Sequence, residues 1–288
     1  LYRASQNLLG IKEKLEVFLS HKTNSLFDLN DKIILYDLTN TYFEGQKEYS
    51  RMAQYFRSKE KRSDAKLICL ALVVNAEGFV KYHKVLRGNI SDPATLEGTI
   101  MELATGSSQS PRKPLVVIDA GIATEENLAM LKSKGYGYLC VTRSKLKEYE
   151  VLKENNRAVK ITDKRKGEIE LSWVEKPGCE DTYLYVRSEG KAKKETSMKM
   201  HFTSHYEDGL EGIRYGIRTK GGTKRLDKVW ERIGRLKERY PSANRFYQIE
   251  VVPQGDKATD LKWQKKKVKT RSSEGVYFLR TTLPPESE

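Results

Sequence analysis

The stretches Pro114-Leu-Val-Val-Ile-Asp119 and Tyr138-Leu-Cys-Val-Thr142 decide the fold. Both runs are short and almost wholly apolar, which is typical of strands buried on two faces. Between them, residues 124–135 have a helical pattern that begins at Thr124 as N-cap and ends at Gly135. Two such strands joined by a helix require a parallel pair inside a covered sheet, so the predicted class is α/β.

Upstream residues add three further strands and a helix. Residues 32–44 are rich in β-branched and aromatic residues, and residues 66–75 and 79–86 form a predicted antiparallel hairpin. A helix follows, with Asp92 at its N-cap and Pro93 in its first turn. The order β-β-β-α-β-α-β predicts a mixed sheet, and a ribonuclease-H-like core is its simplest fit.

The pattern changes after this core. Beyond residue 144 the sequence predicts short strands at 168–174, 182–187, 245–251 and 275–282, with one basic helix among them. We therefore expect four parts: an N-terminal helix in residues 1–30, the core in 31–143, a basic β-rich insertion in 144–273, and a strand that re-enters the core in 274–288.

The charge of the chain is concentrated in this insertion. The chain has 53 Lys and Arg against 39 Asp and Glu, a formal net charge of +14, and residues 187–271 hold 23 of the basic and 11 of the acidic residues. Residues 224–240 form a predicted basic amphipathic helix, and residues 262–271 a second basic cluster on a strand or loop edge with an exposed Trp263. A solvated surface explains either cluster alone, whereas two clusters together favour binding to DNA phosphates. The predicted DNA-binding residues are Arg225, Lys228, Arg232, Arg235, Arg239, Lys262, Lys265, Lys266, Lys267, Lys269 and Arg271.

Several classes of protein are excluded. The longest apolar run, residues 67–74, is far shorter than the roughly 18 residues that indicate a membrane span. The three cysteines are too few and too scattered for a disulfide framework or a zinc site, and Cys69 and Cys140 lie in apolar stretches where a thiol behaves as a small hydrophobe. No signal-peptide pattern is present, so a cytoplasmic location is expected.

Two carboxylates stand where open α/β sheets present their sites. Asp37 lies inside the first strand, and Asp119 stands at the C-terminal end of the first wholly apolar strand. If the two strands are neighbours, the carboxylates converge and repel each other unless a divalent cation lies between them, and Mg²⁺ or Mn²⁺ suits oxygen ligands. A turn or cap residue is the alternative for Asp119.

These residues also carry a resemblance to a known family. Tyr36-Asp-Leu-Thr-Asn-Thr-Tyr-Phe-Glu-Gly45 and Val117-Ile-Asp-Ala-Gly-Ile-Ala-Thr-Glu-Glu-Asn-Leu128 resemble the first and second aspartate motifs of bacterial insertion-sequence transposases of the DDE type, in the group with a β-rich insertion. Arg87-Gly-Asn-Ile-Ser-Asp-Pro-Ala-Thr-Leu96 is similar to the Gly-Asn signature of that group. Gly275-Val-Tyr-Phe-Leu-Arg-Thr-Thr-Leu283 resembles its strand before the glutamate helix.

The resemblance implies a function and a set of site residues. It implies Mg²⁺-dependent cleavage at transposon ends followed by strand transfer, with Asp37 and Asp119 as catalytic metal ligands. It also implies double-stranded DNA as partner, a homodimer on paired ends as one arrangement, and a location at the bacterial nucleoid. Asn89 and Asp92 would lie near the site, although Asp92 is also explained as a helix cap.

One element of the family pattern is missing. The helix with Tyr-x-x-Arg-x-x-x-Glu, which supplies the third acid, does not occur in these 288 residues, and Glu286 and Glu288 are poor substitutes. We therefore expect a transposase fragment that is largely inactive alone, with little metal-dependent nicking, and that leaves apolar sheet surface uncovered. A DNA-binding remnant without catalysis, and a nuclease of the same fold, are the alternatives.

Overall fold

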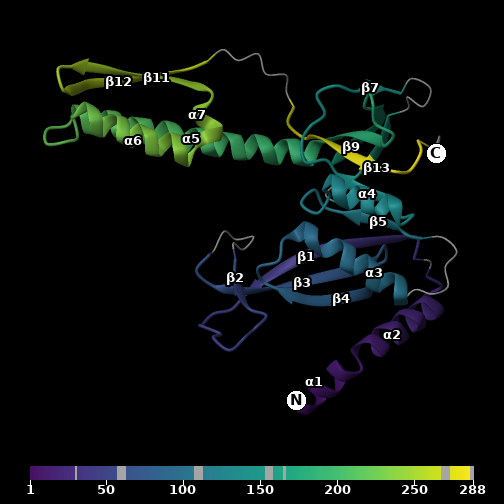
Figure 1. The fold of residues 1–288 in the computed structure, drawn as a ribbon. Coiled ribbons are helices and arrows are strands. Elements are labelled where there is room, and N and C mark those ends of the chain that lie inside the picture. Colours follow the sequence, from purple (N-terminus) through teal and green to yellow (C-terminus); the bar gives the residue numbers. More distant parts are fainter. Residues whose placement is uncertain are drawn as a thin grey trace. The chain divides into compact units, whose positions relative to one another are not determined.

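The computed structural model of the protein describes residues 1–29, 31–56, 63–106, 113–152, 158–164, 167–266 and 273–285 (Figure 1). The chain forms two compact units. The first consists of Leu1–Ala158, Leu171–Tyr185 and Tyr277–Glu288, and the second of Val159–Glu170 and Val186–Val276. Among the described helices, none has the length and apolar character needed to cross a membrane.

Five strands form the centre of the first unit. They are β1 (Ile33–Tyr42), β3 (Lys66–Asn75), β4 (Val80–Arg87), β5 (Leu115–Ile118) and β6 (Tyr138–Val141), in the spatial order β4-β3-β1-β5-β6. Strand β3 is antiparallel to both β1 and β4, whereas β1, β5 and β6 are parallel. This mixed order is compatible with a ribonuclease-H-like fold, and the predicted fold class is confirmed.

The sheet continues beyond these five strands. From β6 its order runs through β13, β10, β9 and β7, while β2 pairs with β3 and β8 pairs with β9. Strand β13 is antiparallel to β6, so the chain returns to the core sheet after the second unit, as the sequence predicts. The bounds of these strands are β2 (Gln54–Tyr55), β7 (Glu150–Val151), β8 (Val159–Thr162), β9 (Glu168–Glu175), β10 (Thr182–Ser188) and β13 (Val276–Thr281).

The helices of the first unit agree with the sequence in part. The single N-terminal helix predicted in residues 1–30 is two helices that meet at Ile11. Thr124 is the N-cap as predicted, and its hydroxyl accepts a hydrogen bond from the Asn127 amide at 3.2 Å. Asp92 is not the N-cap: Ser91 takes that position, and Asp92 begins a 3₁₀ turn. The helices are α1 (Tyr2–Gly10), α2 (Lys12–Phe27), the 3₁₀ helix η1 (Asp92–Thr95), α3 (Leu96–Gly106) and α4 (Glu125–Ser133).

The core of the first unit lies on one face of the sheet. Cys69 and Cys140 are buried there, which confirms that they behave as small hydrophobes. On the other face of β1, Ile33 and Leu35 keep 38% and 39% of their surface exposed. The described residues thus leave apolar surface on that face. The buried set includes Ile34, Tyr36, Leu96, Ile100, Val116, Ile118, Leu128 and Leu131.

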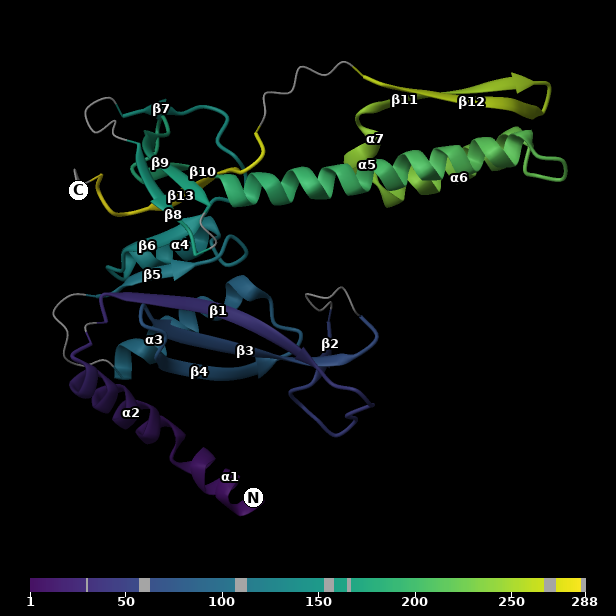
Figure 2. The same cartoon turned by 180° about the vertical axis from the view of Figure 1, so that it is seen from behind.

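The second unit is built on a pair of helices. Helices α5 (Glu189–Arg218) and α6 (Leu226–Arg239) lie side by side, and the hairpin of β11 (Tyr247–Gln254) and β12 (Lys257–Lys265) runs along them (Figures 1 and 2). The short helix α7 (Pro241–Asn244) connects α6 to β11. A separate apolar core, centred on Tyr206, Leu210, Ile213, Val229, Ile233 and Leu261, holds these elements together.

Helix α5 is the main difference from the prediction, which had one helix in this region. Its buried residues Tyr206, Leu210, Ile213 and Ile217 have helical spacing but occupy only the second half of the helix. The first half buries nothing, and glycines occur in both halves. Tertiary packing against α6 and β12 therefore stabilises a helix whose own sequence pattern is weak.

The predicted exposure of Trp263 is wrong. Trp263 lies on β12 opposite Ile249, on the face of the hairpin that packs on the core of the second unit, and it is half-buried. The guanidinium of Arg214 on α5 lies 5.7 Å from the centre of its ring. Strand alternation places Trp263 and Leu261 on the same inner face. The lysines around Trp263 in the sequence suggest an exposed segment instead.

Candidate functional site

Strand register brings Asp37 and Asp119 together. Strands β1 and β5 are parallel, and the last paired positions are Tyr36 and Ile118. One step further along both strands lie Asp37 and Asp119, on neighbouring strands whose backbones are about 4.8 Å apart. Asp37 and Asp119 are both exposed, and Asp119 lies just beyond the carboxyl end of β5. The structure thus places the two predicted acids beside each other.

The turn that follows β5 fixes Asp119. Its Oδ1 accepts a hydrogen bond from the amide of Ile122 at 2.9 Å, which forms an Asx-type turn. A Cβ added at Gly121 would lie 3.2 Å from the same carboxylate, so the turn is tight. This supports the turn role that the sequence left open. Because the contact occupies one of two carboxylate oxygens, it is compatible with a metal-binding role.

Arg143 is a site residue that the sequence reasoning missed. It follows β6 at the same edge of the sheet, and its Nε and Nη2 donate to the carbonyls of Ala120 and Gly121, each at 2.8 Å. The fixed fork of the guanidinium therefore holds both residues after Asp119. The available signal was a basic residue directly after a buried strand that ends beside the strand of Asp119.

Asn89, another predicted site residue, lies away from the acid pair. Asn89 is exposed just after β4, and the amide of the preceding Gly88 donates to the carbonyl of Met52 at 3.1 Å. A Cβ at Gly88 would come within 1.8 Å of the Leu67 carbonyl oxygen, so only glycine permits this approach. Leu67 pairs with Tyr42, five residues beyond Asp37 along β1, or about 16 Å.

Asp92 is connected to β1 through its backbone. Its carbonyl accepts a hydrogen bond from the Thr95 hydroxyl at 2.7 Å, and Thr95 accepts one from the Tyr36 hydroxyl at 2.6 Å. Tyr36 is buried on the helix-covered face, whereas its neighbour Asp37 points to the opposite face. Burial raises the pKa of Tyr36, so the phenol stays neutral and donates. Asp92 thus supports the strand that carries Asp37.

The acid pair has the chemistry of a magnesium site. Within the described ranges, no group of three or more His, Cys, Asp or Glu side chains is placed to hold a metal ion. Two carboxylates still fit Mg²⁺ or Mn²⁺, because Mg²⁺ is commonly held by one or two carboxylates together with water and substrate phosphates. Asp37 and Asp119 are the residues that would hold it.

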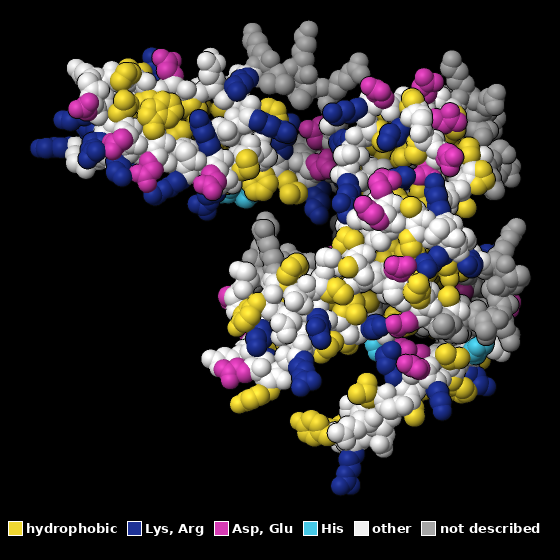
Figure 3. Space-filling view, in the orientation of Figure 1, with side chains coloured by type: hydrophobic (Ala, Val, Ile, Leu, Met, Phe, Trp, Pro, Cys, Tyr) yellow, Lys and Arg dark blue, Asp and Glu magenta, His cyan; other side chains and the backbone are white. Residues whose placement is uncertain are grey.

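The basic residues predicted on the helix form a single stripe on α6. They follow one another at steps of three and four residues, which confines them to an arc of about 80° on an α-helix. Three of them are ion-paired with neighbouring acids, and the side chains of these three are 56–74% exposed. Figure 3 shows basic and acidic side chains interspersed over the visible face of this unit. The stripe consists of Arg225, Lys228, Arg232, Arg235 and Arg239.

The second basic cluster is only partly described. Lys262, Lys265 and Lys266 are exposed on or next to β12, and Lys265 pairs with Glu207 of α5 at 3.0 Å. The remaining predicted residues lie outside the described residues; they are Lys267, Lys269 and Arg271.

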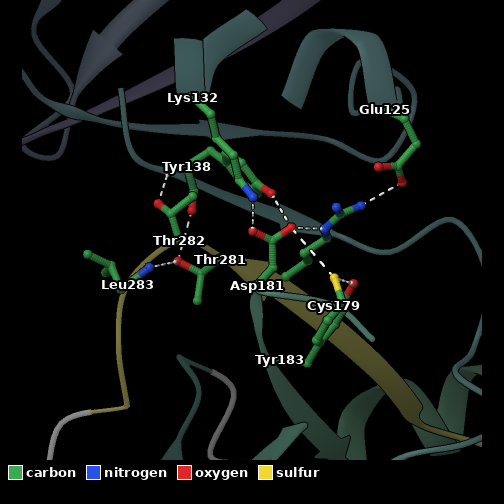
Figure 4. Close-up of polar contacts among 10 residues, drawn as sticks. Glu125, Lys132, Tyr138, Cys179, Asp181, Tyr183, Thr281, Thr282 and Leu283 are labelled. Atoms are coloured by element: carbon green, nitrogen blue, oxygen red, sulfur yellow. Dashed lines mark hydrogen bonds and ion pairs between the residues drawn. The ribbon is translucent and has the colours of Figure 1, made fainter. Parts of the chain in front are cut away.

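A buried carboxylate, which the sequence reasoning also missed, lies elsewhere in the first unit (Figure 4). The side chain of Asp181 is 2% exposed. Its Oδ2 accepts hydrogen bonds from the Tyr138 hydroxyl and from Arg280 Nε, both at 2.6 Å, and its Oδ1 lies 2.5 Å from Lys132 Nζ. Arg280 also pairs with Glu125 at 2.6 Å. This Asp181 network joins β6 and α4 to β13 and to the segment before β10.

In the Asp181 network the hydrogen-bond donors keep Asp181 ionised and Tyr138 neutral. Burial alone would raise the pKa of Asp181, but hydrogen bonds from Lys132, Tyr138 and Arg280 outweigh it and hold the pKa below its usual value. Burial and the hydrogen bond to Asp181 raise the pKa of Tyr138. A carboxylate satisfied by three protein donors has a structural role, because little of it is left for a substrate or a metal.

Comparison with known proteins adds little. No protein-family model matches the sequence, and no curated protein matches it. One solved structure with partial similarity is the piggyBac transposase synaptic complex with hairpin DNA, at 13% identity and a TM-score of 0.30. The match covers 56% of this chain and 33% of that one, so it spans about a third of the solved protein. Similarity at this level has no bearing on fold or function.

Proposed function

We propose that the chain carries the acid pair of a metal-dependent phosphoryl-transfer enzyme that acts on DNA, with the general role of a transposase. The observation that supports this proposal is the register of β1 and β5, whose last printed pair, Tyr36 and Ile118, directly precedes Asp37 and Asp119 in the two neighbouring segments. Neighbouring carboxylates repel each other, and a bound divalent cation relieves that repulsion. The net charge of +14 supplies an attraction for a polyanionic substrate.

The residues of the chain have distinct roles at this edge. Asp37 and Asp119 would hold a divalent cation. Arg143 holds residues 120 and 121, so the carboxylate of Asp119 keeps its place when the substrate enters. Bound Mg²⁺ or Mn²⁺ supplies charge stabilisation of the phosphoryl group and activates a water or a 3′-hydroxyl.

The finer assignment rests on the sequence motifs. The resemblance to insertion-sequence transposases of the DDE type suggests cleavage of 3′ ends and strand transfer on double-stranded DNA. A third carboxylate belongs to that mechanism, and the described residues contain no group of three or more His, Cys, Asp or Glu side chains placed to hold a metal ion. We therefore assign the full reaction to an intact protein and expect this chain to nick DNA slowly.

DNA binding without catalysis is the second candidate function, and it is favoured by the lack of a third converging acid among the described residues. With two rather than three converging acids in the described part of the chain, the protein would grip DNA through its basic residues and catalyse nothing. The two functions share DNA binding and differ in metal-dependent chemistry.

Nicking of supercoiled plasmid separates them. We expect slow nicking in Mg²⁺ or Mn²⁺ that falls to the metal-free level in Asp37→Asn and in Asp119→Asn. The control is Glu97→Gln on α3, which removes an exposed carboxylate from outside the pair and should leave the rate unchanged. Equal nicking by all three variants would contradict the proposal. Tight DNA binding without any nicking would establish the second function.

A further inference from the structure

The basic stripe of α6 lies between buried residues on one side and acidic residues on the other. On the wheel of α6 the buried residues Val229 and Ile233 flank it on one side, and a row of acids, Asp227, Glu231 and Glu238, flanks it on the other. Between Arg225 and Arg239 the stripe extends over about 21 Å of helix. A continuous row of cations without an apolar member matches a regularly charged backbone better than a protein surface, whose interface core is apolar.

Glycines of α5 border this stripe. A Cβ at Gly216 would lie 3.3 Å from the guanidinium of Arg232, and one at Gly209 would lie 2.5 Å from the side chain of Leu236. Gly212 lies between them on the same side of α5, is exposed, and faces open space. The α5 side of the stripe therefore presents bare backbone, which lets a bulky chain approach the cations closely.

The acids beside the stripe are weak competitors. Glu231 pairs with Lys228 at 2.9 Å and with Arg235 at 2.5 Å, and all three side chains are exposed by 42% or more. Exposed pairs of this kind are weak because water screens them, so the cations exchange them for phosphates at low cost. Glu231 thus lowers the affinity for a polyanion without blocking it.

We propose that the α6 stripe and the glycine edge of α5 form a track that binds one sugar-phosphate strand of duplex DNA without reading its sequence. This track rests on the proposed function, since it names the surface by which the same protein holds its DNA. Arg225, Arg232 and Arg239, seven residues apart, contact phosphates, and the glycine edge gives the strand room.

The test is the salt dependence of DNA binding, measured by fluorescence anisotropy with a labelled duplex of random sequence in EDTA. Arg232→Gln combined with Arg239→Gln should weaken binding by about tenfold or more and reduce the slope of log K against log salt by about 2. The control is Lys193→Gln combined with Lys237→Gln, which removes the same charge from other faces of α5 and α6 and should change the slope far less. Circular dichroism confirms that both variants fold.

Two single changes sharpen the test. Glu231→Gln should tighten binding, because it removes the anion that holds Lys228 and Arg235. Gly212→Glu should weaken it, because its side chain fits the open space and places a negative charge on the track. Equal losses in the track and control pairs, or tighter binding of polyglutamate than of DNA, would overturn the track. Such a failure leaves the acid pair intact, because EDTA removes metal chemistry from this assay and plasmid nicking reports on it separately.

Discussion

The first unit holds two groups of carboxylates in opposite environments. Asp181 is almost completely buried and bound by Lys132, Tyr138 and Arg280, whereas Asp37 in the middle of β1 and Asp119 just after β5 are exposed. Burial with a full set of donors makes a carboxylate part of the scaffold. The proposed function gives the two exposed carboxylates a cation to bind. The comparison therefore sets an acid that supports the fold against acids that we propose take part in chemistry.

The largest expected effect is on stability. Asp181→Ala should lower the free energy of unfolding by about 3 kcal/mol, because it leaves the Tyr138 hydroxyl and Arg280 Nε, both largely buried, without their acceptor. Asp119→Ala should cost about 1 kcal/mol, since it removes one turn hydrogen bond at an exposed position. Urea denaturation of the two variants measures both values. Equal losses would remove the distinction between the two groups.

The next effect is on the pH dependence of stability. The pKa of Asp181 is lowered in the folded protein, so its contribution is full above the unfolded pKa near 3.8 and is lost as pH falls through the folded value. We therefore expect the difference in unfolding free energy between the wild type and Asp181→Asn to shrink below about pH 4. Urea titrations from neutral pH downward test this. A difference that stays constant into acid would show that the carboxylate is not charged in the folded state.

A smaller effect is expected at Arg143. Arg143→Lys keeps the charge but loses the fork that holds the carbonyls of Ala120 and Gly121. Stability should change by less than about 1 kcal/mol, because the side chain is exposed. Mn²⁺ affinity should fall a few-fold, because Asp119 is then less well placed. An unchanged affinity in an isothermal titration would separate Arg143 from the acid pair.

Much of the core was predictable because its signals are local. Residues 115–118 and 138–141 are continuous apolar strands, and the position of Asp119 at the end of one of them follows from the parallel pairing alone. Placing Asp37 near Asp119 required only that β1 and β5 be neighbours. The approximate position of the acid pair could therefore be predicted from the sequence.

The remaining features depend on contacts between distant residues. The partners of Asp181 lie 43 and 99 positions away at Tyr138 and Arg280, and no spacing rule connects them. Helix α5 lacks an apolar stripe in its first half and depends on α6 and β12 for stability. Trp263 lies among lysines in the sequence, and only the strand alternation of the hairpin turns it inward.

The most direct test of the central claim is Mn²⁺ binding followed by electron paramagnetic resonance. We expect the wild type to bind Mn²⁺, Asp37→Asn and Asp119→Asn each to weaken binding by about tenfold or more, and Glu97→Gln to bind like the wild type. Loss of affinity in both aspartate variants but not in the control would establish the pair as one metal site. Unchanged binding in either aspartate variant would contradict it.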